Sequence, residues 1–112
     1  MDDRLALAQG DIYWTYLDPT EGREQSGRRP VLVISGEQYH DIVDSLAIVV
    51  PLTTTNRGWP NHVRLSTLEN PSWAMTEQPR TIARRRLQTR IGAATPSELA
   101  EVLAWVLDFV SL

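Results

Sequence analysis

The pattern of apolar and polar positions predicts a small sheet followed by one helix. Short runs rich in β-branched and aromatic residues alternate with segments of glycine, proline and asparagine, which is typical of strands separated by turns. We expect strands at residues 10–17, 30–35, 46–52, 62–66, 72–75 and 77–82, and a last short one at 90–93. Residues 36–43 are expected to form a turn or short helix, and residues 84–87 a short helical turn. Because no βαβ pattern occurs, the fold class is predicted as mainly β with α (α+β), a strongly bent sheet or partly closed barrel.

The C-terminal helix has the clearest local signal in the chain. Thr95, Pro96, Ser97 and Glu98 form a capping box with proline at the first helical position. Apolar residues then recur at three- and four-residue spacing, at Leu99, Val102, Leu103, Val106 and Val110. This stripe is suited to covering a sheet. Trp105 and Phe109 widen it, which leaves room for contact with a second subunit.

Length and composition indicate an ordinary globular chain. With 112 residues, of which 42% are hydrophobic and 22% charged, we expect a single domain spanning residues 1–112. No apolar run approaches the ~20 residues that span a bilayer, and the acidic first residues do not resemble a secretory signal. We therefore expect a cytoplasmic protein with no membrane association. The absence of cysteine excludes disulfides, thiolate nucleophiles and cysteine zinc sites.

The basic residues are more informative in their placement than in their number. The net charge of −3 argues against a protein that coats nucleic acid without specificity, although it permits a local basic patch. All 11 basic residues are arginine. Most of them fall into two clusters: Arg28 and Arg29, then Arg80, Arg84, Arg85, Arg86 and Arg90.

A possible anion site is predicted at the start of the second strand. Pro30 restricts the backbone of Arg29, whose planar guanidinium suits a phosphate or a carboxylate. If the second and third strands are neighbours, Arg29 and Thr53 meet on one rim. RNA cleavage by the neighbouring 2′-hydroxyl could use this pair, because charge accumulates on the phosphate oxygens, and Glu24 is the nearest candidate base. From spacing alone, a surface salt bridge explains Arg29 equally well, whereas a strand cap for Thr53 and a solvated charge for Glu24 are the better explanations.

The remaining candidates have similar alternatives. The tract Arg84 to Arg86 could follow a nucleic-acid backbone and Trp59 could stack on an unpaired base, but solvated charges and a turn tryptophan are the commoner reading. His40 and His62 lack partners at metal-ligand spacing, so we interpret both as structural or surface residues and predict no metal site.

Six segments, in order along the chain, together resemble one known family. They are GDIYW at 10–14, LDP at 17–19, GREQ at 22–25, RRPVLVIS at 28–35, AIVVPLT at 47–53 and EQPRTI at 77–82. In this combination the chain resembles the MazF/PemK family of toxin endoribonucleases, over nearly its whole length.

The resemblance implies a fold, a reaction and partners. The fold would be a small SH3-like barrel of the CcdB/PemK/MazF type, with the C-terminal helix packed on the sheet, in a homodimer. The protein would be the toxin of a type II toxin–antitoxin system, opposed by a MazE-type antitoxin whose acidic tail covers the RNA groove. It would cut single-stranded RNA at short sequences without metal or cofactor, leaving 2′,3′-cyclic phosphate and 5′-hydroxyl ends. mRNA is the expected target, with tRNA and rRNA as alternatives.

The resemblance also assigns residues. Arg29 and Thr53 match the family's catalytic pair, and Glu24 matches its loop, either as the base or as a residue that orients the loop. Gln25 also matches the loop, and Glu77 and Gln78 match a segment that lines the RNA groove. Together with the basic and aromatic candidates, the expected RNA-binding set is Gln25, Arg28, Trp59, Glu77, Gln78, Arg80, Arg84 and Arg86. The loop at 54–61 varies within the family, so the recognised RNA sequence is not predicted.

Two alternatives use the same barrel without catalysis. A gyrase-poisoning toxin would end in tryptophan, glycine and isoleucine, whereas this chain ends Phe109-Val110-Ser111-Leu112. A non-catalytic dimer that binds RNA or a protein partner would keep its activity after Arg29→Ala. The fold alone does not separate these functions.

Overall fold

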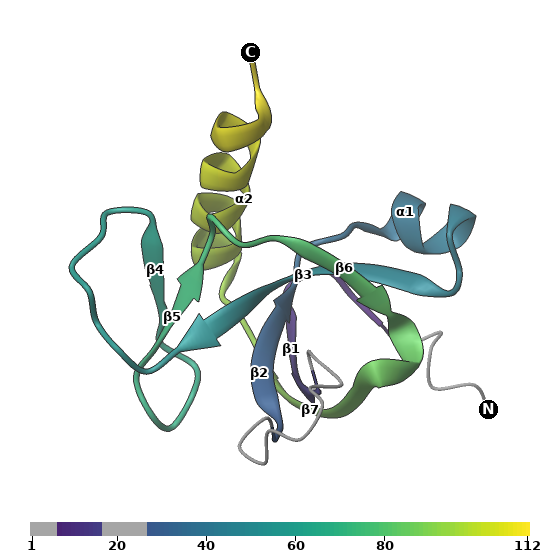
Figure 1. The fold of residues 1–112 in the computed structure, drawn as a ribbon, viewed down its shortest axis with the longest axis horizontal. Helices are drawn as coiled ribbons and strands as arrows, with labels where there is room; N and C mark the ends of the chain where they lie inside the picture. Colours follow the sequence, from purple (N-terminus) through teal and green to yellow (C-terminus); the bar gives the residue numbers. More distant parts are fainter. Residues whose placement is uncertain (1–6, 17–26) are drawn as a thin grey trace.

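The structure, a computed structural model, describes residues 7–16 and 27–112. A curved sheet holds short strands, and one long helix rises from it (Figure 1). In chain order the elements are β1 (Asp11–Thr15), β2 (Arg29–Val33), α1 (Glu37–Ile42), β3 (Leu46–Thr53), β4 (His62–Leu65), β5 (Ser72–Met75), β6 (Arg80–Ala83), the 3₁₀ turn η3 (Arg84–Arg86), β7 (Leu87–Ala93) and α2 (Pro96–Val110).

All described strand pairs are antiparallel, and β3 is central because it pairs with β2, β5 and β6. The order is β4-β5-β3-β2-β1-β7, with β6 pairing separately with β3. The first half of β3 pairs with β6 and its last two residues with β5, while β2 pairs along its middle. From β6 the chain passes through η3 into β7, which pairs with β1 (Figure 1). Among the described strands, no pairing between β6 and β7 closes the barrel.

The predicted fold class is confirmed, a mainly antiparallel sheet with a C-terminal helix. Each predicted strand overlaps an observed one, and residues 36–43 hold α1. The prediction at 77–82 was wrong in its first half, because the chain turns there: the Gln78 amide donates to the Met75 carbonyl, 3.0 Å away. The short strand expected at 90–93 is the end of the longer β7.

Alternation along the strands separates two apolar clusters on opposite faces of the sheet. The larger contains Ile12, Leu32, Val50 and Leu52, and α2 adds Val102 to it. The second contains Val31, Val33, Ala47, Val49 and Ile82. Successive residues of β2 and β3 contribute alternately to the two clusters. The side chains at the ends of these strands therefore also point alternately to the two faces of the sheet.

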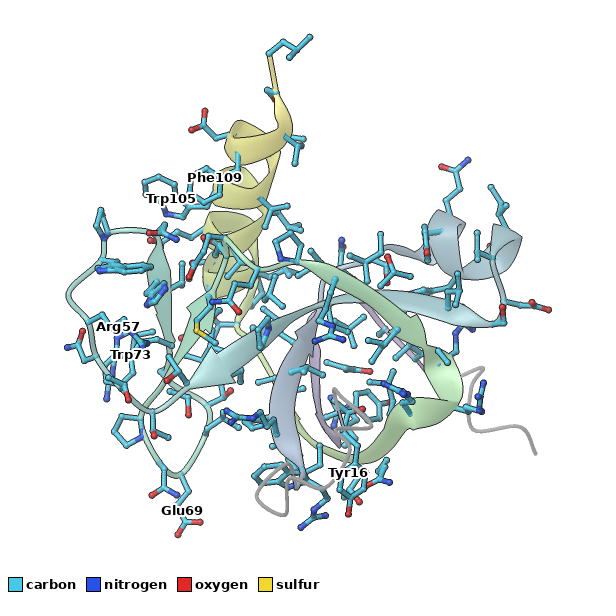
Figure 2. All side chains as sticks on the ribbon, viewed as in Figure 1. Tyr16, Arg57, Glu69, Trp73, Trp105 and Phe109 are labelled. Atoms are coloured by element: carbon cyan, nitrogen blue, oxygen red, sulfur yellow. The ribbon has the colours of Figure 1, made fainter. Side chains whose placement is uncertain are left out.

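Helix α2 is fixed at its start and projects at its end. The Thr95 hydroxyl accepts from the Glu98 amide at 3.2 Å, and a Glu98 carboxylate oxygen accepts from the Thr95 amide at 2.9 Å, as the capping box predicts. The other Glu98 oxygen accepts from the amide and hydroxyl of Ser66, just after β4. Farther along, Leu107, Phe109 and Val110 are exposed where the helix extends beyond the sheet (Figures 1 and 2). No helix in the described ranges is long and apolar enough to cross a membrane.

Candidate functional site

Arg29 and Thr53 lie level with each other at one rim of the sheet. In the antiparallel pairing of β2 with β3, Val31 is opposite Pro51, and the same register brings Arg29 opposite Thr53 two residues further on. Their side chains leave the same face, because both are two residues from that pair. The neighbouring strands required by the sequence prediction are therefore present.

The polar groups at this rim are available to a ligand. The Arg29 side chain is exposed, and within residues 7–16 and 27–112 its guanidinium has no hydrogen-bond or ion-pair partner. The Thr53 hydroxyl oxygen accepts from the Thr55 amide at 3.1 Å, which leaves its own hydrogen to donate. A planar cation and a hydroxyl donor on one rim are a suitable pair for a phosphate.

Arg28 lies beside this pair, on an aromatic ring. Its guanidinium carbon is 5.0 Å from the centroid of the Trp14 ring, and β1 and β2 pair Trp14 with Pro30. The stacked arrangement leaves the guanidinium edge free for hydrogen bonds. Two arginines and a threonine thus occupy adjacent positions at the ends of β2 and β3, which we call the Arg29 rim.

The β3–β4 loop is anchored to the turn between β5 and β6. The Asn61 side-chain nitrogen donates to a Glu77 carboxylate oxygen at 2.8 Å, and the His62 Nε2 lies 3.1 Å from both Glu77 oxygens. The rings of Trp59 and His62 have centroids 4.8 Å apart. Trp59 remains 48% exposed, so the loop holds an accessible aromatic surface on a fixed base.

The hydrogen bonds of this anchor show which ring nitrogen of His62 carries a hydrogen. His62 is buried, and Nε2 must carry a hydrogen to donate to the carboxylate. Its Nδ1 is buried without a partner among the described residues. Burial alone raises the pKa of Glu77, but hydrogen bonds from His62, the backbone and Gln78 outweigh it and the pKa is lowered. Glu77 is therefore held as an anion that positions the loop, while Gln78 beside it is exposed.

Arg84, which the sequence analysis includes in the expected RNA-binding set, has a different environment from the rim arginines. Its side chain is only 7% exposed. The guanidinium donates to the carbonyls of His40, Val43 and Leu46, at the end of α1 and the start of β3. These carbonyls accept from Nε and Nη2, so Arg84 fixes the connection between α1 and β3 and offers little surface to a phosphate.

The other members of the arginine tract lie near the surface. Arg86 is half-buried and donates to the Tyr16 carbonyl at 3.3 Å, next to the end of β1, while Arg85 is exposed. Arg80 is exposed and lies opposite Val49 in the β3–β6 pairing. Glu24 and Gln25 lie outside the described residues.

Two clusters were missed in the sequence. Neither the Asn61–His62–Glu77 anchor nor the contact between His40 Nε2 and the Ser35 hydroxyl, at 2.7 Å, was predicted. Both depend on strand pairing: β4 and β5 bring His62 opposite Met75, two residues before Glu77. Only a correct hairpin prediction could have revealed the first. Within the described ranges, no group of three or more acidic or histidine residues is arranged to hold a metal ion.

The fold and the Arg29 rim define a small antiparallel-sheet protein with a donor-rich edge suited to a polyanion. Residues 8–110 match the family described as PemK-like, MazF-like toxin of type II toxin–antitoxin system, and the chain belongs to this family. The chain is 37% identical over 105 residues to the endoribonuclease toxin MazF of Escherichia coli K12, covering 93% of this chain and 94% of that protein. It is 31% identical over 103 residues to the endoribonuclease MazF of Staphylococcus epidermidis, covering 86% and 84%.

Solved structures agree with the fold. A crystal structure of MazF from Deinococcus radiodurans superposes with a TM-score of 0.78 at 28% identity, covering 95% of this chain and 97% of that one. A MazE–MazF structure from the same organism gives a TM-score of 0.78 at 27% identity, covering 93% and 95%. The barrel-like sheet with its C-terminal helix is thus the MazF fold.

Proposed function

We propose that this protein is the ribonuclease toxin of a type II toxin–antitoxin pair, cutting single-stranded RNA at specific short sequences without a metal ion. The observation that supports the proposal most is the Arg29 rim. There a guanidinium and a hydroxyl donor face one side with no protein acceptor among the described residues. Relatives named as endoribonucleases, at up to 37% identity over most of the chain, support the same activity.

The proposed reaction is an internal transfer at phosphorus. The ribose 2′-oxygen attacks the adjacent phosphorus and loses its proton to a base, and the bond from phosphorus to the 5′-oxygen breaks as that oxygen takes up a proton. The products are a 2′,3′-cyclic phosphate and a 5′-hydroxyl. Arg29 and Thr53 donate to the non-bridging oxygens, whose charge grows in the transition state. We propose Glu24 as the base, with a water molecule as the alternative.

The surrounding groups would hold the RNA strand. Arg28 on Trp14 provides a charge beside the reacting phosphate, and exposed Trp59 provides a ring on which an unpaired base can stack. Gln25, Gln78, Arg80 and Arg86 complete the proposed contact set. Glu77 contributes by anchoring the β3–β4 loop, through Asn61 and His62.

We propose a MazE-type antitoxin and a second copy of the chain as partners. A MazE–MazF structure from Deinococcus radiodurans supports the first. The second is supported by the exposed apolar residues Leu107, Phe109 and Val110 at the end of α2. RNA as substrate and such an antitoxin as partner imply the cytoplasm, with mRNA as the principal target and tRNA or rRNA as alternatives.

The proposal is tested by incubating the purified, antitoxin-free protein with long single-stranded RNA in excess EDTA and mapping the fragment ends. Discrete cuts bearing cyclic phosphate are expected, and Arg29→Ala should abolish them. Arg85→Ala is the matched control, because Arg85 is exposed on η3 and not at the rim. Intact RNA with folded wild-type protein, or equal cutting by Arg29→Ala, would reject the proposed chemistry.

A further inference from the structure

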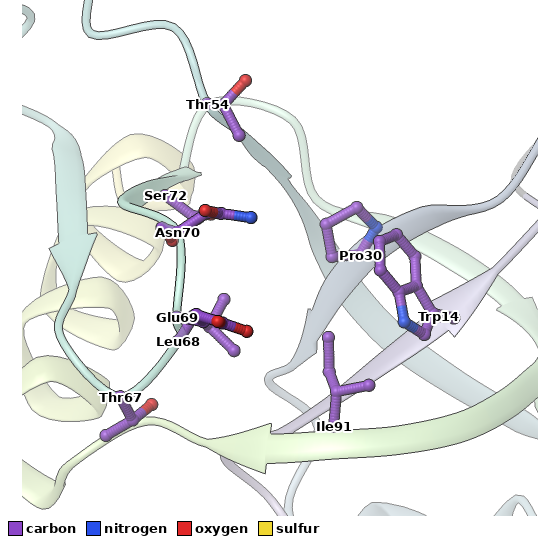
Figure 3. Close-up of a pocket in the computed structure, with 9 residues that line it drawn as sticks. All are labelled: Trp14, Pro30, Thr54, Thr67, Leu68, Glu69, Asn70, Ser72 and Ile91. Carbon is purple, nitrogen blue, oxygen red and sulfur yellow. The ribbon is translucent and has the colours of Figure 1, made fainter.

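A cavity of about 360 Å³ opens beside the Arg29 rim, on the opposite face of β2 (Figure 3). One wall comes from the sheet, with Trp14, Pro30 and Ile91. The other comes from the β4–β5 loop, from Ser72 at the start of β5 and from Thr54 just after β3; its loop residues are Thr67, Leu68, Glu69 and Asn70. The volume falls within the range of small-molecule sites, about 300–1,000 Å³.

The two walls differ in chemistry. The sheet wall presents an indole ring, a proline ring and an isoleucine, which suit the face of a flat ligand. From the loop wall, the Glu69 carboxylate and the Asn70 side-chain amide point across the cavity towards that apolar wall (Figure 3). This combination suits a planar ligand with a polar edge.

Two polar side chains of the loop wall, those of Glu69 and Asn70, have no partners in the described part of the chain. Neither the Glu69 carboxylate nor the Asn70 side-chain amide makes a hydrogen bond or ion pair there. The loop itself is nevertheless held: the Thr67 hydroxyl donates to the Ala93 carbonyl at 2.6 Å, and the Ser72 hydroxyl to the Asn70 carbonyl at 3.2 Å. The loop thus presents a free acceptor and a free amide from a fixed backbone.

The cavity is one residue away from the proposed catalytic groups on both strands. Arg29 and Thr53 face one side of the sheet, and the next residues, Pro30 and Thr54, line the cavity on the other side. Arg28 stacks on Trp14, a residue of the cavity wall. A phosphate at the rim can therefore place its attached nucleoside across the strand ends and into the cavity.

We infer that this cavity binds one unpaired RNA base next to the cleaved bond, and that Glu69 and Asn70 read its edge. Stacking on the Trp14 wall would hold the base, as aromatic side chains do for splayed-out bases in RNA complexes. The inference rests on the proposed ribonuclease function for the identity of the ligand as RNA. It assigns part of the sequence specificity to the β4–β5 loop.

The arrangement of charge favours a nucleotide over an acidic peptide. A nucleotide carries its negative charge at the phosphate, where Arg28 and Arg29 lie, and its N–H donors on the base, where Glu69 lies. An acidic side chain entering the cavity would meet the Glu69 carboxylate and be repelled. The Arg29 rim therefore suits the phosphate of a nucleotide, and the cavity suits its base.

The carboxylate also predicts which bases fit. An ionised carboxylate only accepts hydrogen bonds, so it favours an exocyclic amino group, which adenine, cytosine and guanine possess. The edge of uracil presents two carbonyl oxygens beside a single N–H. We therefore expect discrimination against uracil at one position near the cut.

The test compares wild type with Glu69→Gln and Asn70→Ala, using RNA pools that contain a randomised single-stranded segment. One pool is cleaved in EDTA, and a second, made non-cleavable by 2′-fluoro substitution, is selected for binding. Wild type should select against uracil at one fixed position in both pools. Glu69→Gln should shift the ratio of amino-bearing bases to uracil at that position by about tenfold, because its amide can donate to uracil.

The control is Glu101→Gln, which removes the same charge from an exposed position on α2 and should leave every base ratio unchanged. Glu69 and Asn70 are exposed loop residues, and thermal unfolding of each variant checks that its fold is intact. Asn70→Ala should weaken the selection at the same position and no other. The ratio, not the total binding, is the readout, because removing any acidic charge near RNA strengthens binding generally.

The two pools separate the two proposals. Cleavage with base ratios that are unchanged in both loop variants would overturn the base-binding inference, leave the ribonuclease function in place and suggest a protein side chain as the occupant. Base selection that Glu69→Gln shifts in the binding pool, without any cleavage, would support the inference and reject the ribonuclease function. A wild-type protein that neither binds nor cuts RNA would overturn both.

Discussion

Two arginines, Arg29 and Arg84, each stand next to other arginines in the sequence but have different environments. Arg29 opens β2 at the rim of the sheet, exposed and without a protein partner in the described ranges. Arg84 opens η3, buried, with its guanidinium bonded to three carbonyls. The number of neighbouring arginines therefore does not decide which one is available to a ligand. The backbone acceptors around each side chain decide it.

The comparison extends to the groups around each arginine. Near Arg29, the Thr53 hydroxyl keeps a hydrogen to donate, and Arg28 rests on a ring. Near Arg84, His40 is buried with its Nε2 2.7 Å from the Ser35 hydroxyl, which also accepts from the Ile48 amide at 3.0 Å. We therefore expect substitutions at the rim to change activity, and substitutions around Arg84 to change stability.

The largest effect is expected at Arg29. Replacing it with alanine should lower the single-turnover rate of RNA cleavage by about 10²–10³-fold, as for loss of one transition-state donor. The free energy of unfolding should change by less than about 0.5 kcal/mol, because the side chain is exposed. Cleavage kinetics and urea unfolding on the same preparation check both parts. A large loss of stability would mean that the rim is structural, like the surroundings of Arg84.

The opposite result is expected for Arg84. Arg84→Ala leaves three carbonyls near α1 without their donor and should lower the free energy of unfolding by about 3 kcal/mol. Arg85→Ala, one residue along η3 and exposed, is the control and should change it by less than about 0.5 kcal/mol. Urea unfolding measures both. Equal stability of the two variants would remove the distinction between them.

How far the sequence could predict these environments depends on the range of the interactions. The place of Arg29 follows from a local signal, the proline and apolar strand after it, and its pairing with Thr53 required only that two strands be neighbours. The burial of Arg84 depends on carbonyls about forty residues earlier in the chain. The sequence of Arg84 to Arg86 therefore gave no sign that one of the three arginines is buried. Separation in sequence is the reason that this part of the site could not be predicted.

Other outcomes follow the same rule. The capping box of α2 is local and was predicted correctly. The anchor of Glu77 to His62 depends on the pairing of β4 with β5, and the cavity beside Trp14 joins residues from several strands and a loop; neither was predicted. The roles of Glu24 and Gln25 remain predictions from the family resemblance.

A smaller effect is expected from the histidine near Arg84, through pH. Burial first, and then the charge of Arg84, lower the pKa of His40 from its ordinary value, against the raising effect of Asp41 and Asp11. The unfolded chain therefore binds this proton more readily, and stability should fall as the pH drops below about 6.5 towards the lowered pKa. His40→Gln should make the unfolding free energy less dependent on pH in this window. A steeper dependence in the variant would contradict the assignment.

The most direct test of the Arg29 rim is a double-mutant cycle on the single-turnover cleavage rate, using Arg29→Ala, Thr53→Val and their combination. Thr53→Val keeps the shape but removes the hydroxyl, and alone it should slow cleavage by about tenfold. If both groups donate to one phosphate, the double variant should be slowed by clearly less than the product of the two single effects. Independent, multiplicative effects, or full activity in Thr53→Val, would contradict a shared phosphate site at the ends of β2 and β3.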